Sequence, residues 1–154
     1  MAASSASTQA ARQVWKMIVS GKRFENVLSK VNITSASPGQ CSCELTVAEE
    51  QANRRGSLHG GFVSTLVDTL TTVAVLSSPA GVPGVSVELS VSFLKAARIG
   101  DQLTMDAEVI KAGKSLAFSK ANLFNANGDI IAQGNHVKHV GRKNTVEDFI
   151  DLDE

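Results

Sequence analysis

Residues 59–78, with the sequence HGGFVSTLVDTLTTVAVLSS, decide the fold of this chain. Their apolar residues recur at the three-and-four spacing of an α-helix with one buried face. The set comprises Phe62, Val63, Leu66, Val67, Leu70, Val73, Ala74 and Ser77. Pro79, Gly81, Pro83 and Gly84 follow and end the pattern. The stretch predicts one long helix packed in the middle of a domain.

Asp68 is the one formal charge in residues 56–87. At about 100° per residue, its side chain lies opposite the apolar stripe, beside the small hydroxyls of Ser64, Thr71 and Thr72. Such a face suits contact with another protein surface better than contact with water. A carboxylate that is partly desolvated there becomes a better general base. A lone solvated acid on a helix face is the simpler alternative.

The same helix opens with His59-Gly60-Gly61. Two glycines weaken a helix, but they allow a ligand to approach the backbone closely. The first N–H groups of a helix have no internal acceptor, so they can bind the oxyanion of a thioester carbonyl. A glycine turn without any ligand explains these residues equally simply.

Gly60 and Asp68 are too far apart to act on one carbonyl within a single chain. Eight residues of helix span about 12 Å, whereas a donor and a base must each lie within about 3 Å of their targets. Two antiparallel helices across a dimer would bring Gly60 of one beside Asp68 of the other. We therefore expect a composite site and an obligate dimer.

Strand patterns flank the helix on both sides. Residues 41–47 alternate with a period of two, and Pro38–Gly39 marks a turn from an earlier strand near 31–36. Residues 48–58 are polar and are expected to form a loop. Further strands are expected over 85–93, 103–109, 115–125 and 129–140, with hairpin turns at Gly113–Lys114 and Asn127–Gly128. In 85–93 the apolar residues are odd-numbered and Ser86 falls among the polar, even-numbered ones. This order predicts an α+β fold with a mostly antiparallel sheet on one long helix.

Composition sets further limits. Lys and Arg together number 15, as do Asp and Glu, so the charge balance gives no support for nucleic-acid binding. No apolar run reaches the roughly 20 residues of a transmembrane helix. Cys41 and Cys43 share one strand face and are expected to be small buried residues.

The two ends differ from the middle. Residues 1–24 carry four basic residues and no acid, which is typical of a mitochondrial transit peptide. The helical spacing of Val14, Trp15, Ile18 and Val19 favours a capping helix instead. We expect a flexible segment at 1–11, one domain at 12–142, and an acidic, disordered tail at 143–154.

Several motifs together resemble the hotdog-fold acyl-CoA thioesterases of the phenylacetic-acid-pathway branch. They are the stretch 53–61 (NRRGSLHGG), Thr65-Leu66-Val67-Asp68, 84–87 (GVSV) and 111–118 (KAGKSLAF). The resemblance covers roughly residues 12–142. It implies an antiparallel sheet wrapped around a long central helix, a homodimer with one continuous sheet, and a homotetramer of two dimers. It also implies hydrolysis of medium- to long-chain acyl-CoA without a metal or other cofactor.

The resemblance implies roles for five residues. Gly60 would supply the oxyanion N–H, and Asn53 would hold the thioester carbonyl or the water. Asp68, from the other subunit, would act as general base or as nucleophile, and both mechanisms stay open. Ser86 would position the water or Asp68, and His59 would orient Asn53 or the thioester.

Contacts to CoA are implied for Ser86 and for three other places in the chain. The residues are Phe93, Leu94, Lys95, Ala96, Ala97, Arg98, Lys111, Ala112, Gly113, Lys114, Ser115, Leu116 and His139. The cations at Lys95, Arg98, Lys111 and Lys114 suit the CoA phosphates. The segment Phe93-Leu94-Lys95-Ala96 departs from the family's Tyr-Met-Ser-Pro-like pattern.

Other interpretations are weaker. His136 and His139 would lie on opposite strand faces, which disfavours a metal site. A Ser86–His59–Asp68 triad lacks the Gly-x-Ser-x-Gly elbow. A non-catalytic acyl-CoA sensor would have lost Asp68 or the HGG turn, and a hotdog hydratase would pair an acid with a histidine in the helix. A lipid-transfer-type protein partner and a cytoplasmic or mitochondrial location are the remaining expectations.

Overall fold

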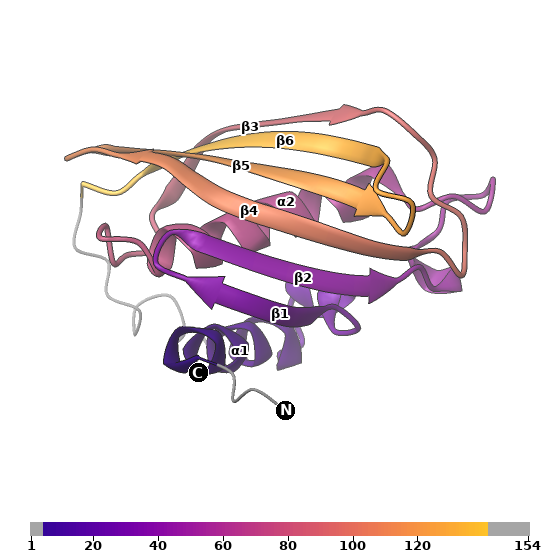
Figure 1. The fold of residues 1–154 in the computed structure, drawn as a ribbon, viewed down its shortest axis with the longest axis horizontal. Coiled ribbons are helices and arrows are strands. Elements are labelled where there is room, and N and C mark those ends of the chain that lie inside the picture. Colours follow the sequence, from indigo (N-terminus) through magenta and orange to yellow (C-terminus); the bar gives the residue numbers. More distant parts are fainter. Residues whose placement is uncertain (1–4, 142–154) are drawn as a thin grey trace.

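A computed structural model of the chain describes residues 5–141. Residues 1–4 and 142–154 lie outside this description, and with them the tail expected at 143–154. In chain order the elements are α1 (Ala6–Ser20), the 3-10 helix η1 (Phe24–Leu28), β1 (Asn32–Ser37), β2 (Gln40–Thr46), the 3-10 helix η2 (Glu49–Gln51), α2 (Gly60–Leu76), β3 (Val85–Phe93), β4 (Gln102–Ala112), β5 (Leu116–Asn125) and β6 (Ile130–His139). The predicted order of helices and strands is confirmed (Figure 1).

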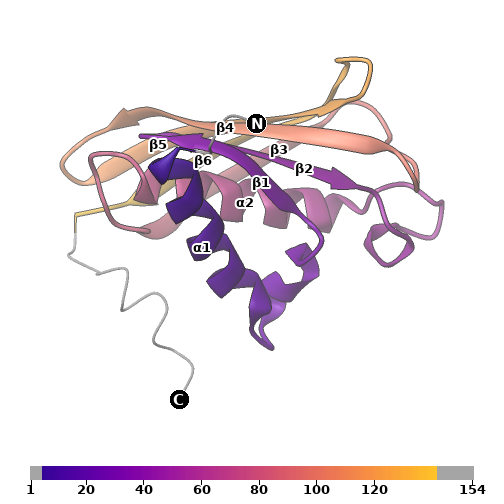
Figure 2. The same cartoon turned by 60° about the horizontal axis from the view of Figure 1, so that its bottom comes forward.

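The six strands form one antiparallel sheet in the order β1-β2-β4-β5-β6-β3. Figure 2 shows α2 lying against one face of this sheet, with α1 beside β1. The predicted α+β fold, with an antiparallel sheet around a long central helix, is confirmed. We call the face that α2 covers the inner face and the opposite one the outer face.

The core lies between α2 and the inner face. Leu66, Leu70 and Ala74 are fully buried, and so is Cys43. The helix comes unusually close to β6 at Gly134, where an added Cβ would lie 2.5 Å from Val67 Cγ1. A side chain at this position would therefore push the helix away from the sheet.

The two cysteines are buried, as predicted. Both pack in the core beside other inner-face residues of the sheet. Burial raises the pKa of the Cys41 thiol to about 12, so this thiol stays protonated at neutral pH.

Part of the hydroxyl face of α2 is not a free surface for another protein, and the prediction was wrong for Thr71 and Thr72. Thr71 and Thr72 are buried within the chain itself, at 0% and 5% exposure. Their hydroxyls face β6, where they meet His136 and Lys138. The sheet carries polar residues opposite them, which periodicity in the helix alone does not reveal. Asp68, whose side chain is 47% exposed, borders this buried polar region.

α1 covers the outer edge of β1. Ser5 caps the helix by accepting from Thr8 N at 3.2 Å. Side chains of α1 then bind backbone oxygens along the strand: Thr8 Oγ1 donates to Ala36 O (3.3 Å), Arg12 Nε to Ile33 O (3.0 Å) and Trp15 Nε1 to Val31 O (3.1 Å). Because α1 begins at Ala6, the boundary of the flexible segment expected at 1–11 was wrong. The cap at Ser5 starts the helix earlier than its apolar spacing indicated.

β3 forms the other edge of the sheet and has no strand beyond it in the described chain. Both of its faces are largely exposed, including Val85 (59%), Val87 (61%) and Phe93 (58%). A long exposed apolar edge strand is rare in a chain that works alone, because its unpaired backbone groups invite another strand. The edge is thus available for pairing.

Candidate active site

The candidate residues fall into two groups at opposite ends of β3 in a single chain. Asn53, Gly60 and the segment 93–98 lie near its carboxyl end, whereas Ser86, the 111–116 hairpin and His139 lie near its start. The two ends of the strand are roughly 23 Å apart. We call the first group the amide half-site and the second group, with Asp68, the carboxylate half-site.

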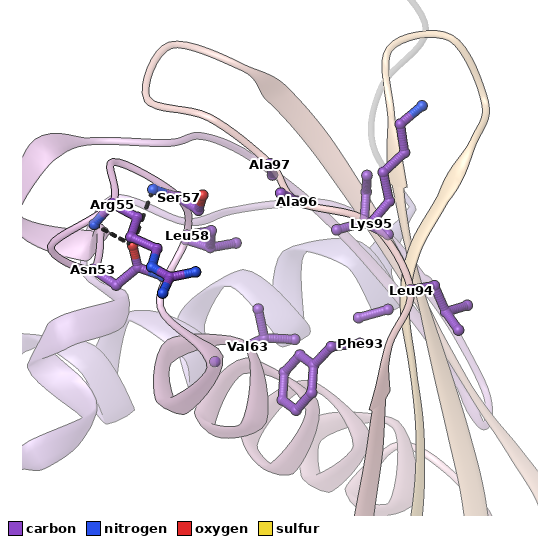
Figure 3. A pocket seen from close by; sticks show the side chains of 13 residues that line it. Asn53, Arg55, Ser57, Leu58, Val63, Phe93, Leu94, Lys95, Ala96 and Ala97 are labelled. Atoms are coloured by element: carbon purple, nitrogen blue, oxygen red, sulfur yellow. Dashed lines mark hydrogen bonds between the residues drawn. The ribbon is translucent and has the colours of Figure 1, made fainter.

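The amide half-site lines a cavity of about 420 Å³ (Figure 3). Its wall comprises Asn53, Arg55, Ser57, Leu58, Gly60, Val63, Phe93, Leu94, Lys95, Ala96, Ala97, Ile131 and Ala132. Asn53 Oδ1 accepts from Arg55 N at 2.9 Å and from Ser57 N at 3.2 Å. These bonds commit the oxygen of the carboxamide, so its NH₂ group is the part left to bind a ligand.

Gly60 begins α2 at the edge of this cavity. In the described chain its N–H has no acceptor, as expected for the first donor of a helix. An added Cβ would lie 3.3 Å from the Phe93 ring, so the ring packs against the bare backbone. The site thus has a free N–H beside an apolar wall.

His59 caps α2 and does not orient Asn53. Its Nδ1 accepts from Gly61 N at 2.9 Å, and no hydrogen bond joins it to Asn53 in the residues described. The helix N-terminus uses Nδ1 of the imidazole. His59 therefore fixes the start of the helix, and with it the direction of the Gly60 N–H. The other role implied for His59, orienting the thioester, stays a prediction.

The carboxylate half-site holds Asp68, Ser86 and His136. Ser86 Oγ lies 2.8 Å from His136 Nε2 and 3.5 Å from Asp68 Oδ1. On the other side of the ring, His136 Nδ1 lies 2.7 Å from Thr71 Oγ1. A neutral imidazole donates through one nitrogen and accepts through the other, so it links the two hydroxyls across the core.

A β-bulge aims Ser86 at this group. Ser86 pairs with Lys138 on the inner face, while Glu88 pairs with Val137 on the outer face, and Val87 is the extra residue between them. Without the bulge, Ser86 and Glu88 would share one face, as strict alternation predicted. The bulge shifts the register by one residue and turns Ser86 to the inner face.

His136 is an uncharged residue at neutral pH. It is fully buried, and its pKa is lowered to about 4 by burial first and by the nearby positive charge of Lys138 second. The carboxylate of Asp68 acts in the opposite direction but is outweighed. The same burial lowers the pKa of Lys138 to about 8, again against the pull of Asp68.

A second cavity, of about 230 Å³, opens at the carboxylate half-site. It is lined by Ile18, Glu25, Asp68, Thr69, Thr72, Gly84, Val85, Ser86 and Lys138. One carboxylate and one hydroxyl of the site therefore face open space, while His136 lies behind them. The arrangement can hold and activate a small nucleophile such as water, but it has no oxyanion donor like Gly60.

The CoA candidates are divided between the ends of β3 in the same way. At the amide half-site, Lys95 Nζ forms an ion pair with Asp129 at 2.5 Å and extends away from Asn53 and Val63 (Figure 3). Arg98 Nη1 donates to Arg55 O at 3.0 Å and thereby holds the loop before Gly60. The exposed hairpin 111–116 lies at the other end, where Leu116 pairs with His139.

Sequence reasoning missed two residues of the carboxylate half-site. His136 was considered only as a metal ligand, and Lys138 was not considered at all. Their signal is the inner face of β6, which reads Ala132, Gly134, His136, Lys138. Two ionisable side chains at positions of a buried strand face are unusual enough to indicate a function.

Comparison with known proteins identifies the family. The family model described as Thioesterase superfamily matches residues 55–132, which include Gly60, Asp68 and Ser86. The chain belongs to this superfamily. Thioester hydrolysis is the reaction after which the superfamily is named, and the chain is a thioester hydrolase.

Relatives within the superfamily match nearly the whole fold. Acyl-coenzyme A thioesterase 13 of Homo sapiens is 44% identical over 135 residues, which are 87% of this chain and 96% of the relative. The crystal structure of zebrafish thioesterase superfamily member 2 has a TM-score of 0.86 at 43% identity and covers 89% of this chain and 100% of its own. The mouse structure of that protein has a TM-score of 0.82 at 40% identity and covers 89% and 99%. The resemblance inferred from the motifs is thereby confirmed.

Two further observations concern metal sites and membrane-spanning helices. Within the described residues, no three His, Cys, Asp or Glu side chains come together as a metal site would require. None of the helices over residues 5–141 is long and apolar enough to span a membrane.

Proposed function

We propose that the chain hydrolyses medium- to long-chain acyl-CoA to a fatty acid and CoA, in active sites shared between two protomers. The name of the relatives in Homo sapiens and Mus musculus, acyl-coenzyme A thioesterase 13, supports acyl-CoA as the substrate. The observation that carries the shared site is the division of the candidate residues. Asn53 and Gly60 lie at one end of β3 and Ser86 lies at the other, so one chain holds two incomplete halves.

The edges of the sheet support a dimer through β3. β1 is covered by side chains of α1, whereas β3 is open and apolar. Antiparallel pairing of two β3 strands about a two-fold axis would place the Phe93 end of one beside the Ser86 end of the other. The amide half-site of each protomer would then face the carboxylate half-site of its partner.

In this composite site, the Gly60 N–H and the Asn53 carboxamide would polarise the thioester carbonyl. The partner's Asp68, held near Ser86, would take a proton from water as the oxygen attacks the carbonyl carbon. The C–S bond then breaks, and the CoA sulfur leaves and acquires a proton. Attack by the Asp68 carboxylate itself, through an anhydride that water opens, is the alternative use of the same geometry.

CoA would be held from both sides of the dimer. Residues 93–98 of one protomer would contact it beside the 111–116 hairpin and His139 of the other. Lys111 and Lys114 are exposed and can reach phosphates, while Arg98 already serves the loop before Gly60. The proposed reaction uses no metal or other cofactor.

The wider expectations stay proposals. A tetramer of two such dimers and a lipid-transfer-type partner follow from the family resemblance alone. The packing of α1 on β1 supports retention of this helix in the working protein, because its removal would uncover the β1 edge. That argues against removal of α1 as a cleaved presequence, and the proposed location stays cytoplasmic or mitochondrial.

Thiol release from acyl-CoA substrates of chain lengths from C2 to C18 tests the proposal, with wild type and Asp68→Ala assayed in parallel. We expect turnover of the longer chains and a loss of about 10²-fold or more in kcat for the variant, with an unchanged oligomer. Binding of acyl-CoA by the wild type without thiol release would sink the enzymatic proposal and favour an acyl-CoA sensor.

A further inference from the structure

Lys138 is a buried cation inside the carboxylate half-site. Its side chain is 4% exposed, and Nζ donates to Thr72 Oγ1 at 2.7 Å. Among the residues described, this is the one hydrogen bond of the ammonium group, and no carboxylate forms an ion pair with it. Burying an ammonium group without a paired anion is costly. Such a residue calls for a function beyond packing.

The charged groups that face Lys138 come from three elements. α2 contributes Asp68, η1 contributes Glu25, and β6 itself contributes His136. His136 and Lys138 are two residues apart on one strand face, so their backbones are roughly 7 Å apart. The neighbouring positions on β3 and β5, Ser86 and Ala117, carry no charge.

His136 is placed where it can disable the carboxylate. Its Nε2 lies 3.5 Å from Asp68 Oδ1. A protonated imidazole at that distance would form an ion pair with Asp68 and neutralise the charge that the reaction needs. A neutral imidazole leaves the carboxylate available and can still bind Ser86 and Thr71.

We propose that Lys138 is a positioning residue, whose ammonium group keeps the His136 imidazole uncharged and so leaves the Asp68 carboxylate free to act on the thioester. This inference rests on the catalytic role proposed above for Asp68. It explains why a charged lysine is buried here. The Lys138 ammonium group and a protonated His136 would be two positive charges on adjacent inner-face positions of β6, and they would repel each other. The proton that is lost is the one on His136, since a lysine holds its proton more firmly.

The pH range of the effect follows from the two groups. The pKa of Lys138 is lowered by burial to about 8, so its ammonium group is charged below that pH. Burial is the larger cause that lowers the pKa of His136 to about 4, and across the acidic range the charge of Lys138 adds to it by opposing protonation of the ring. Above about pH 8 Lys138 loses its charge, but His136 is neutral there in any case. Removing the charge of Lys138 should therefore change activity on the acidic side only.

The test is the pH profile of kcat/KM for long-chain acyl-CoA hydrolysis by the full-length protein. Lys138→Gln keeps an N–H donor for Thr72 but removes the charge, and Lys138→Arg keeps the charge. We expect the acidic limb of the profile to move to higher pH by about 0.5–2 units in Lys138→Gln. In Lys138→Arg the acidic limb should lie where it lies in the wild type. All profiles should converge above about pH 8.

Lys120→Gln is the matched control. Lys120 lies on neighbouring β5, partly exposed, and pairs with Glu108 at 2.9 Å. Removing its charge should leave the acidic limb unchanged. The same result is expected for any lysine that contributes only to packing. An unshifted acidic limb in an assembled Lys138→Gln protein overturns the inference.

Ring-nitrogen NMR of the wild type can still overturn the inference if Lys138→Gln does not assemble. With His136→Asn used for assignment, the His136 ring should stay neutral down to about pH 5, whereas titration near the ordinary value of about 6.5 overturns the inference. Asp68→Asn separates the two proposals. Full activity in Asp68→Asn defeats the proposed mechanism, whereas an inactive Asp68→Asn with an unshifted Lys138→Gln profile defeats only the role of Lys138.

Discussion

Ser86 on β3 and His136 on β6 are joined at 2.8 Å, although 50 residues separate them in the chain. The contact exists because Val87 bulges out of β3 and turns Ser86 toward the helix. It ties the open edge strand to the buried polar region beneath α2. The position of the proposed catalytic groups thus depends on the bulge in the edge strand.

Ser86→Ala should lower kcat by roughly 10- to 100-fold, because Asp68 would lose the hydroxyl that lies between it and His136. Steady-state thiol release measures the effect. Ser90→Ala is the control, since Ser90 pairs with Asn135 on the outer face of the same strand. Equal losses in the two variants would contradict the placement of Ser86.

Mixed dimers should reveal a shared active site. Asn53→Ala and Asp68→Ala are each expected to be inactive alone. Coexpressed, they should regain activity, because one of the two sites in a mixed dimer then takes its amide half from the Asp68→Ala chain and its carboxylate half from the other. Activity of differently tagged, copurified dimers is the measurement.

The control pair for this experiment is Asp68→Ala with Ser86→Ala. Both changes lie in the carboxylate half-site, so every site of a mixed dimer contains one of them. No activity should return. Recovery in this pair would show that the Asp68 and Ser86 of one site come from different chains. Failure of the first pair to recover would show that each chain carries its own complete site.

Val87→Lys should break the dimer. Val87 is 61% exposed in the single chain, so a lysine there costs the monomer fold little but places a charge on the pairing edge. Light scattering after size-exclusion chromatography should show a smaller particle, and thiol release should fall with it. Ile110→Lys is matched in exposure, at 60%, and also sits at a bulge, but on β4, away from this edge. It should still dimerise.

Gly134→Ala should destabilise the protein by about 1–3 kcal/mol, because its Cβ would meet Val67 at 2.5 Å. The added Val67→Ala change should recover part of this loss by making room. Chemical denaturation of the two single variants and the double variant gives the coupling between the positions. Strictly additive effects would mean that the two residues do not touch.

The long helix and the strands were predictable because each follows one period. Residues 59–78 repeat at helical spacing over several turns, and the strands from 85 onward alternate between turn-forming residues. Asp68 stood out for a related reason, since it is a lone charge on an apolar helix. Such signals are local and need no knowledge of the partner element.

The parts that failed depend on pairs that are distant in the chain. Thr71 meets His136 65 residues away, and Thr72 meets Lys138 66 residues away, so a face that looked suited to another protein is satisfied internally. The bulge at Val87 has no residue signature of its own, and it reversed the face of Ser86. Register between strands decides such details, and periodicity within one strand does not.

The helix that covers β1 also determines how many chains the sheet can recruit. In polymer terms, a sheet with two reactive edges is a bifunctional monomer, and it grows into a fibre of unlimited length. Arg12 and Trp15 donate to backbone oxygens of the β1 edge. The chain is therefore comparable to a monofunctional monomer, which has one reactive edge. Growth through the proposed β3 pairing would therefore stop after a single coupling step, so the edge that exposes the chain to aggregation would yield a product of defined size.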